Sequence, residues 1–262
     1  MITTLFNTIF FQPILNLLVW LYVTVPGQDV GIAIILLTVV VKIILYPLTH
    51  LQIKQQRGMQ ALQPKIEEIR KRLKDDKEKQ AAELMELYKK EKVNPASSCL
   101  PLLVQLPVFL ALFHALQVGL QSQGLNMLYP FVPNPQSINA MFLGVFDLAQ
   151  PPSLENPFTA VLVVLAGLVQ CWQTRQILKP PAATVSAPPP EVAKTEGAKD
   201  ESMTAIMNKQ MAFMMPIMTV VIGFTLPAGL TLYWLTMSLL TVAQQALVLK
   251  KMPPKIEPQL TM

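Results

Sequence analysis

Charge is scarce in this sequence, and its scarcity excludes an ordinary soluble domain. Only 14% of the 262 residues are Asp, Glu, Lys or Arg, whereas 52% are hydrophobic. A soluble domain carries roughly a quarter charged residues. The charges that are present gather in blocks between long apolar stretches, which is typical of a membrane protein with polar connections. The net charge of +5 does not indicate DNA binding, because acids and bases alternate within these blocks.

Residues that commonly bind metals or perform catalysis are also few. The two cysteines, Cys99 and Cys171, fall in or beside apolar segments, and the two histidines, His50 and His114, are isolated. This spacing supports neither a disulfide framework nor a zinc site nor a Cys/His catalytic pair. The ten glycines do not form a nucleotide-binding loop. We therefore expect no metal, no cofactor and no enzymatic reaction.

The apolar stretches predict an all-α polytopic membrane protein. Crossing the hydrocarbon of a bilayer takes roughly 20 apolar residues. Stretches near this length predict five transmembrane helices, at 30–49, 99–120, 158–178, 208–226 and 230–249. The other segments are predicted as connections, namely a helical hairpin at 50–95, a loop at 121–157, a Pro-rich loop at 179–207 and a tail at 250–262.

Residues 1–29 are apolar but are interrupted by Asn, Gln and Pro, and they contain no Lys or Arg. They therefore lack the basic start of a signal peptide. We interpret this segment as an amphipathic helix in the outer membrane interface, with Trp20 and Tyr22 as aromatic anchors. A membrane-spanning helix is the alternative interpretation.

The distribution of basic residues predicts the orientation. Twelve of the 21 lie in 50–95, five in 174–209 and three in the tail, whereas 1–41 and 93–174 contain none. Cytoplasmic connections of membrane proteins are enriched in Lys and Arg. The N-terminus and the long loop are therefore expected outside, and the hairpin, the Pro-rich loop and the tail in the cytoplasm. The one remaining base is Lys42, inside the first span.

Two apolar stripes with spacings of three and four residues predict that segment 50–95 is an antiparallel helix pair. The stripes consist of Met59, Leu62, Ile66, Ile69 and Leu73, and of Ala81, Leu84 and Tyr88. Asp75 is placed to cap the second helix, with Glu78 three residues later. The basic faces of this pair are either simply solvated or contact a ribosome, lipid headgroups or a nascent chain.

Lys42 is the sharpest candidate for a functional residue. A lysine near the centre of a membrane helix costs about 2.5–3.5 kcal/mol on insertion scales. The five predicted spans contain no Asp or Glu to pair with it. One interpretation is snorkelling, since the cytoplasmic end lies about seven residues, or roughly 10 Å, away. The other is that a water-filled cavity open to the cytoplasm keeps Lys42 hydrated.

Polar residues on several spans favour the cavity. They line one face of the first and fifth spans, where Thr49, Thr231 and Gln245 continue the pattern, and they recur in the second and third spans. Each could instead form a hydrogen bond between helices, the commoner role of a single Gln or Thr in a membrane. The candidate groove residues are Lys42, Thr38, Tyr46, Gln105, Gln170, Trp234, Ser238 and Thr241.

Methionines crowd the start of the fourth span. Met is adaptable in shape, so the cluster serves either as packing or as a surface for varied apolar substrates. The candidates for substrate contact are Met211, Met214, Met215 and Met218.

Long motifs in a fixed order connect this sequence to a known family. They are IILLTVVVKIILYPLTHLQIKQ at 34–55, LQPKIEEIRKRLKDDKEKQ at 62–80, LYKKEKVNPASSCLPLLVQLPVFLALF at 87–113, MPIMTVVIGFTLPAGLTLYW at 215–234 and LLTVAQQ at 239–245. Taken together, from about residue 10 to residue 250, they resemble the YidC/Oxa/Alb family of membrane protein insertases, in its short form without the large outer domain of Gram-negative members.

The resemblance implies a five-span core around a hydrophilic groove that is open to the cytoplasm and lipid but closed outside. It places the cation of the groove at Lys42, and a groove-lining glutamine and aromatic residue at Gln105 and Trp234. The family usually has arginine at the cation position. Lysine keeps the charge but loses the forked donor geometry of a guanidinium.

The implied function is the insertion and folding of nascent integral membrane proteins, alone or beside the Sec translocon. The implied location is a bacterial plasma membrane, with the N-terminus outside and the C-terminus in the cytoplasm. Membrane lipids are expected partners, and the ribosome is a further candidate through the basic hairpin 50–95 and the tail. The residues alone leave two alternatives, a secondary transporter or channel and a non-inserting assembly factor. An internal repeat or a titratable acid for a proton relay, which would favour a transporter, is not found.

Overall fold

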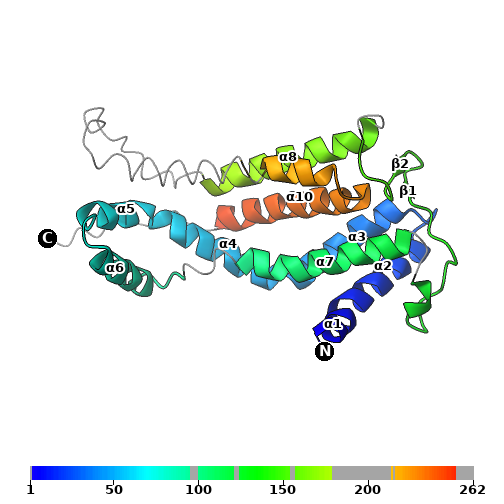
Figure 1. Ribbon diagram of the computed structural model, residues 1–262, viewed down its shortest axis with the longest axis horizontal. Helices are drawn as coiled ribbons and strands as arrows, with labels where there is room; N and C mark the ends of the chain where they lie inside the picture. Colours follow the sequence, from blue (N-terminus) through cyan, green and yellow to red (C-terminus); the bar gives the residue numbers. More distant parts are fainter. Residues whose placement is uncertain are drawn as a thin grey trace.

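The computed structural model describes residues 2–94, 100–120, 124–153, 157–178, 214 and 216–251. In these ranges nearly all regular structure is helical, and the long helices lie side by side (Figure 1). A smaller helical hairpin extends from one end of the bundle, which we call the hairpin end. A loop comprising residues 124–153 covers the opposite end, which we call the loop end. The predicted Pro-rich loop and nearly all of the predicted tail lie outside the described residues.

The chain begins with a single helical rod made of α1 (Ile2–Phe6), the π-helical turn η1 (Asn7–Phe11) and α2 (Gln12–Thr24). Proline lacks an amide hydrogen, and Pro13 is tolerated because it lies in the first turn of α2, just after the π-helical turn. Leu15, Leu18 and Val19 are almost fully buried, because the rod packs on α3 and α7. It starts away from the bundle and approaches it at the loop end (Figure 1).

Helix α3 (Val30–Ile44) and helix α4 (Tyr46–Ala61) meet at an angle of 67°. The predicted span 30–49 is therefore not one straight helix but is broken at Leu45. Pro47 is the physical reason, because a proline ring clashes with the carbonyl four residues earlier and is tolerated only in the first turn of a new helix. The Asp29 carboxylate caps the other end of α3, where it accepts a hydrogen bond of 3.0 Å from the Ile32 amide.

The hairpin consists of α5 (Gln63–Arg72) and α6 (Lys77–Lys90). Leu62, Ile66 and Ile69 from the predicted stripe are buried. Ion pairs of Lys65 with Glu91 and of Arg72 with Glu83 connect its two arms at the surface.

The predicted cap of α6 is wrong by one residue. The helix begins at Lys77, so Asp76 rather than Asp75 occupies the capping position and accepts a hydrogen bond of 3.0 Å from the Lys79 amide. Hydrogen bonds from Lys79 lower the pKa of the Asp76 carboxyl, and the bond from the Lys79 side chain contributes more than the bond from its backbone.

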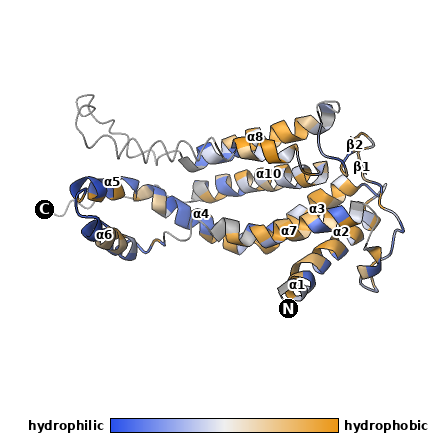
Figure 2. Ribbon diagram, viewed as in Figure 1, coloured by the Kyte–Doolittle hydropathy of each residue, from blue (hydrophilic) through white to orange (hydrophobic). Residues whose placement is uncertain are grey.

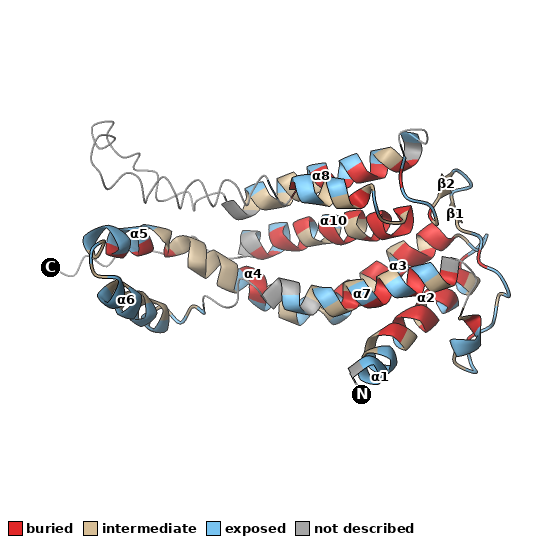
Figure 3. Ribbon diagram, viewed as in Figure 1, coloured by how far each residue is buried: buried red, intermediate tan, exposed pale blue. Residues whose placement is uncertain are grey.

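Helices α7 (Leu100–Leu120), α8 (Pro157–Leu178) and α10 (Ala228–Lys251) complete the bundle, and residues 216–223 are also helical. Helix α10 packs against α3, α4, α7 and α8, and most of its face toward them is buried (Figure 3). The bundle is largely apolar, whereas α5 and α6 are hydrophilic (Figure 2). This contrast follows from composition, because the charged residues of the described chain concentrate in the hairpin.

Length and apolarity single out different segments from those expected. Among the described residues, Thr3–Thr24 is the one unbroken helix that is long and apolar enough to cross a membrane. The pair α3 and α4 passes the same test only as one bent unit, and α7 contributes the shorter apolar stretch Gln105–Gly119. The count of five spans and the interfacial position of residues 1–29 stay predictions.

Hydrogen bonds attach the loop of residues 124–153 to the helices. It contains η3 (Leu125–Met127) and a two-stranded antiparallel hairpin of β1 (Met141–Phe142) and β2 (Phe146–Asp147). Asp29 accepts a hydrogen bond of 2.7 Å from the Leu143 amide, and the Gly229 amide donates one of 3.0 Å to the Leu148 carbonyl. Tyr22 takes part as well, so it is not the interfacial anchor that we expected. Its ring is buried, and its hydroxyl accepts a hydrogen bond of 3.0 Å from the Asn139 amide.

Candidate functional site

The contact between α3 and α10 contains the buried cation. Lys42 is only 8% exposed, and its ammonium donates a hydrogen bond of 2.9 Å to the Thr241 hydroxyl. Ser238, one turn earlier on α10, is also buried. Thr38, one turn earlier on α3, is fully buried and donates to the Ile34 carbonyl at 2.6 Å. The structure thus brings Lys42 and Thr241 into direct contact and places Thr38 and Ser238 within a turn of them.

Lys42 has no acidic partner in the part of the chain that the structure describes. An ammonium group carries three donors, and the Thr241 hydroxyl takes one of them. A buried charge with unmatched donors is costly unless water or a bound polar group completes its shell. The arrangement is therefore suited to binding an acceptor or a negative charge that comes from outside the chain.

Tyr46 is separated from this contact by the bend. Its side chain is 48% exposed, and its ring stacks on His50 with 6.1 Å between the centroids. A straight helix would have aligned Tyr46 with Thr38 and Lys42, but the break at Leu45 interrupts that face.

Gln105 and Trp234 belong to the contact between α7 and α10. The Gln105 amide donates a hydrogen bond to the Tyr233 hydroxyl, and the rings of Phe109 and Trp234 lie 5.5 Å apart. Tyr233 is 1% exposed. We did not select it from the sequence, because the polar pattern of the fifth span passes through its neighbour Trp234.

The remaining candidates lie on the other helices. Gln170 on α8 is half-buried, and its backbone carbonyl accepts a hydrogen bond of 2.9 Å from the Thr174 hydroxyl. Met214 and Met218 are each 52% exposed, as a surface for apolar contact requires. Met211 and Met215 lie outside the described residues.

A second polar contact lies closer to the hairpin end, between α4 and α10. The Gln244 amide donates a hydrogen bond of 2.9 Å to the Thr49 hydroxyl, and Gln244 is 5% exposed. Gln52 and Gln245, at 8% and 4% exposure, lie within a turn of this pair. Gln52 and Gln244 were missed at the sequence level, because the bend brings α4 onto α10 in a way that a straight helix does not predict.

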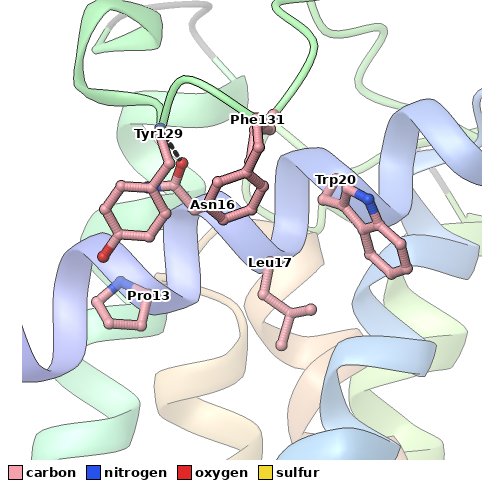
Figure 4. Close-up of a pocket in the computed structure, with 7 residues that line it drawn as sticks. Pro13, Asn16, Leu17, Trp20, Tyr129 and Phe131 are labelled. Atoms are coloured by element: carbon pink, nitrogen blue, oxygen red, sulfur yellow. Dashed lines mark hydrogen bonds between the residues drawn. The ribbon is translucent and has the colours of Figure 1, made fainter.

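An apolar cleft opens between α2 and the loop, with a volume of about 220 Å³ (Figure 4). Pro13, Leu17 and Trp20 line it from the helix, and Tyr129 and Phe131 from the loop. The Asn16 carboxamide connects the two sides, since its oxygen accepts a hydrogen bond of 2.6 Å from the Tyr129 amide. Lined almost entirely by apolar and aromatic side chains, this cleft is not the polar groove that we expected.

These features define a class, that of a helical protein with a charged hairpin at one end and a polar contact inside an apolar bundle. The family follows from comparison of the sequence. The chain belongs to the family described as 60Kd inner membrane protein, whose profile matches residues 20–255. This confirms the resemblance found in the motifs and assigns the chain to a family of bacterial inner membrane proteins.

Several relatives carry the name membrane protein insertase YidC. The protein from Fusobacterium nucleatum is 38% identical over 221 residues, which cover 84% of this chain and 86% of the relative. Proteins from Haemophilus influenzae and a Ruegeria species are 34% and 35% identical over 91% and 92% of this chain. The chain spans only 37% and 36% of these two longer relatives.

Proposed function

We propose that this chain inserts nascent proteins into the membrane and assists their folding through a hydrophilic groove centred on Lys42. The buried ammonium of Lys42, held by a hydroxyl rather than by a carboxylate, carries this proposal. The relatives named membrane protein insertase support it, with the Fusobacterium nucleatum protein matching over most of its length. In this arrangement the loop end faces outside and the hairpin end faces the cytoplasm.

The groove lowers the barrier to a polar flank of the substrate. Lys42 keeps water inside the membrane and attracts acidic residues of the flank, so the flank crosses a shorter apolar distance. Thr38, Ser238 and Thr241 offer further polar contacts, and the apolar segment leaves sideways into lipid along the exposed apolar faces of the bundle. Hydrophobic partitioning and the membrane potential supply the driving force.

The hairpin is the proposed contact for cytoplasmic partners. Helix α6 exposes more lysines than glutamates, so a charged surface with a basic excess faces the side from which ribosomes deliver nascent chains. The exposed charged residues are Lys77, Lys79, Lys89, Lys90, Glu78 and Glu86. The same surface suits anionic lipid headgroups. Cooperation with the Sec translocon is a further part of the proposal and follows from the resemblance to the insertase family.

Insertion into proteoliposomes by purified Lys42 variants tests the proposal. With a single-span substrate that has an acidic flank, Lys42→Ala should lower the inserted fraction roughly tenfold, corresponding to a loss of about 1.4 kcal/mol. Lys42→Arg should retain insertion because the charge remains, and Lys42→Glu should favour a basic flank over an acidic one. Lys54→Ala, which removes an exposed lysine from α4, is the matched control. Wild-type insertion by Lys42→Ala would contradict the proposed role of the groove.

A further inference from the structure

Two buried glutamines near the hairpin end have polar atoms for which the described residues provide no partner. They are Nε2 of Gln52 on α4 and Oε1 of Gln245 on α10. Both side chains are more than nine-tenths buried, with exposures of 8% and 4%. Buried polar groups in proteins are nearly always hydrogen-bonded to protein, water or ligand. These two atoms are therefore unsatisfied by the part of the chain that the structure describes, and water or a bound polar group would complete their hydrogen bonding.

Their positions place them next to the two polar contacts of α10. Gln245 lies one turn beyond Thr241, the residue that binds Lys42. Gln52 lies one turn beyond Thr49, which bonds to Gln244, the immediate neighbour of Gln245. Both glutamines thus lie on the hairpin side of Lys42. A polar segment moving from the cytoplasm toward Lys42 passes this level of the bundle.

The chemistry of the two atoms restricts the ligand. One is a donor and the other an acceptor, and both belong to uncharged amides. A peptide group is their complement, since its carbonyl accepts and its N–H donates. Every substrate presents such groups whatever its side chains. Recognition of this kind suits a protein that handles many different sequences, whereas Lys42 responds to the charge of the flank.

Resting on the proposed insertase function, we propose that Gln52 and Gln245 bind backbone peptide groups of the entering polypeptide, independently of its sequence. Two outcomes separate this role from a structural one. Replacing an unpartnered buried amide by leucine removes no internal hydrogen bond, so Gln52→Leu and Gln245→Leu should keep the melting temperature in detergent at or above that of the wild type. A loss of stability would instead assign the amides to internal packing.

The decisive measurement is insertion of three single-span substrates whose flanks are acidic, neutral or basic. The double variant Gln52→Leu/Gln245→Leu should lower insertion of all three by a similar factor, roughly tenfold. Lys42→Ala should affect the acidic flank most. Gln117→Leu makes the same chemical change at an exposed position of α7 and should leave insertion unchanged. Equal insertion by the double variant and the wild type, or a loss that follows the charge of the flank, would overturn the proposal.

Backbone esters in the substrate provide an independent test. Translation with α-hydroxy acids replaces N–H groups of the flank by oxygen. The flank then lacks the N–H donors from which Oε1 of Gln245 would accept hydrogen bonds. This substrate should insert less well than its amide counterpart into wild-type proteoliposomes, and the difference should shrink in the double variant. An equal difference in both proteins would exclude backbone recognition, and failure of the wild type to insert any substrate would instead refute the proposed insertase function.

Discussion

A hydroxyl group holds Lys42, and this choice of partner leaves the positive charge of the side chain uncancelled. A buried carboxylate would have formed an ion pair whose attraction offsets its own desolvation and leaves little field for a third group. Thr241 accepts one hydrogen bond and brings no charge. The residue pair therefore keeps a cation inside the bundle that still attracts water and anions, as the proposed groove requires.

Gly31 is the residue on which close contact between α3 and the loop depends. A Cβ atom at this position would lie 2.1 Å from a ring carbon of Phe142 in β1, far inside van der Waals contact. Gly31→Ala should therefore displace the β-hairpin and lower the stability by about 1–3 kcal/mol, the usual cost of overpacking. Thermal unfolding in detergent, followed by circular dichroism, measures this effect.

Gly119→Ala on α7 is the matched control, because its nearest neighbour beyond its own helix would lie at 3.7 Å, an ordinary contact. It should be neutral or slightly stabilising, since alanine favours a helix over glycine by up to about 1 kcal/mol. A smaller side chain at Phe142 should restore part of the stability of Gly31→Ala. Equal melting temperatures for Gly31→Ala and Gly119→Ala would contradict the close contact.

At the scale of elements, the bend between α3 and α4 determines where the hairpin is held. Pro47 breaks the helix, and the Thr49–Gln244 hydrogen bond fixes the first turn of α4 to α10 beyond the break. Helix α4, which leads to the hairpin at its far end, is thereby attached at its start to the helix that also binds Lys42. Movement of the hairpin and the geometry around Lys42 are consequently connected through α10.

Thr49→Val should weaken this connection. It leaves the Gln244 amide, 5% exposed, without its partner, which costs about 1–3 kcal/mol for a buried polar group. The double variant Thr49→Val/Gln244→Leu should recover part of the loss, because both polar groups are then removed. Thr236→Val is the control, since that hydroxyl bonds only within α10, to the Leu232 carbonyl. A double-mutant cycle of melting temperatures measures the coupling between Thr49 and Gln244. Additive losses in the two single variants would show that this hydrogen bond does not join α4 to α10.

Composition and periodicity predicted the helices more reliably than their boundaries and contacts. The helical stretches expected at 99–120 and 158–178 correspond to α7 and α8 almost residue for residue, because long apolar runs have few alternatives. The break at Leu45 was missed, since apolar residues continue through it and only Pro47 signals it. Gln52 was missed and Tyr22 was assigned the wrong role, both for the same reason. Their environment is created by elements distant in sequence, α10 and the loop, which local patterns do not contain.

At the scale of the whole molecule, positive charge is distributed unequally between the two ends of the long axis. The hairpin at one end is rich in Lys and Arg, and the loop at the other end contains neither. This asymmetry predicts that the loop lies outside and the hairpin in the cytoplasm. Single cysteines introduced into a variant without Cys99 and Cys171 report the sidedness. Ser137→Cys in the loop and Ala82→Cys on α6 both replace exposed residues. A membrane-impermeant maleimide should label Ser137→Cys in intact cells, and Ala82→Cys only after permeabilisation.

Thr3→Cys extends the measurement to the N-terminal rod. This residue is exposed at the start of a helix that is long enough to span a membrane yet packs at the loop end through α2. An interfacial rod places both of its ends outside, so Thr3→Cys should be labelled in intact cells as readily as Ser137→Cys. Labelling that requires permeabilisation would mean that the rod spans the bilayer, with residue 3 on the same side as α6.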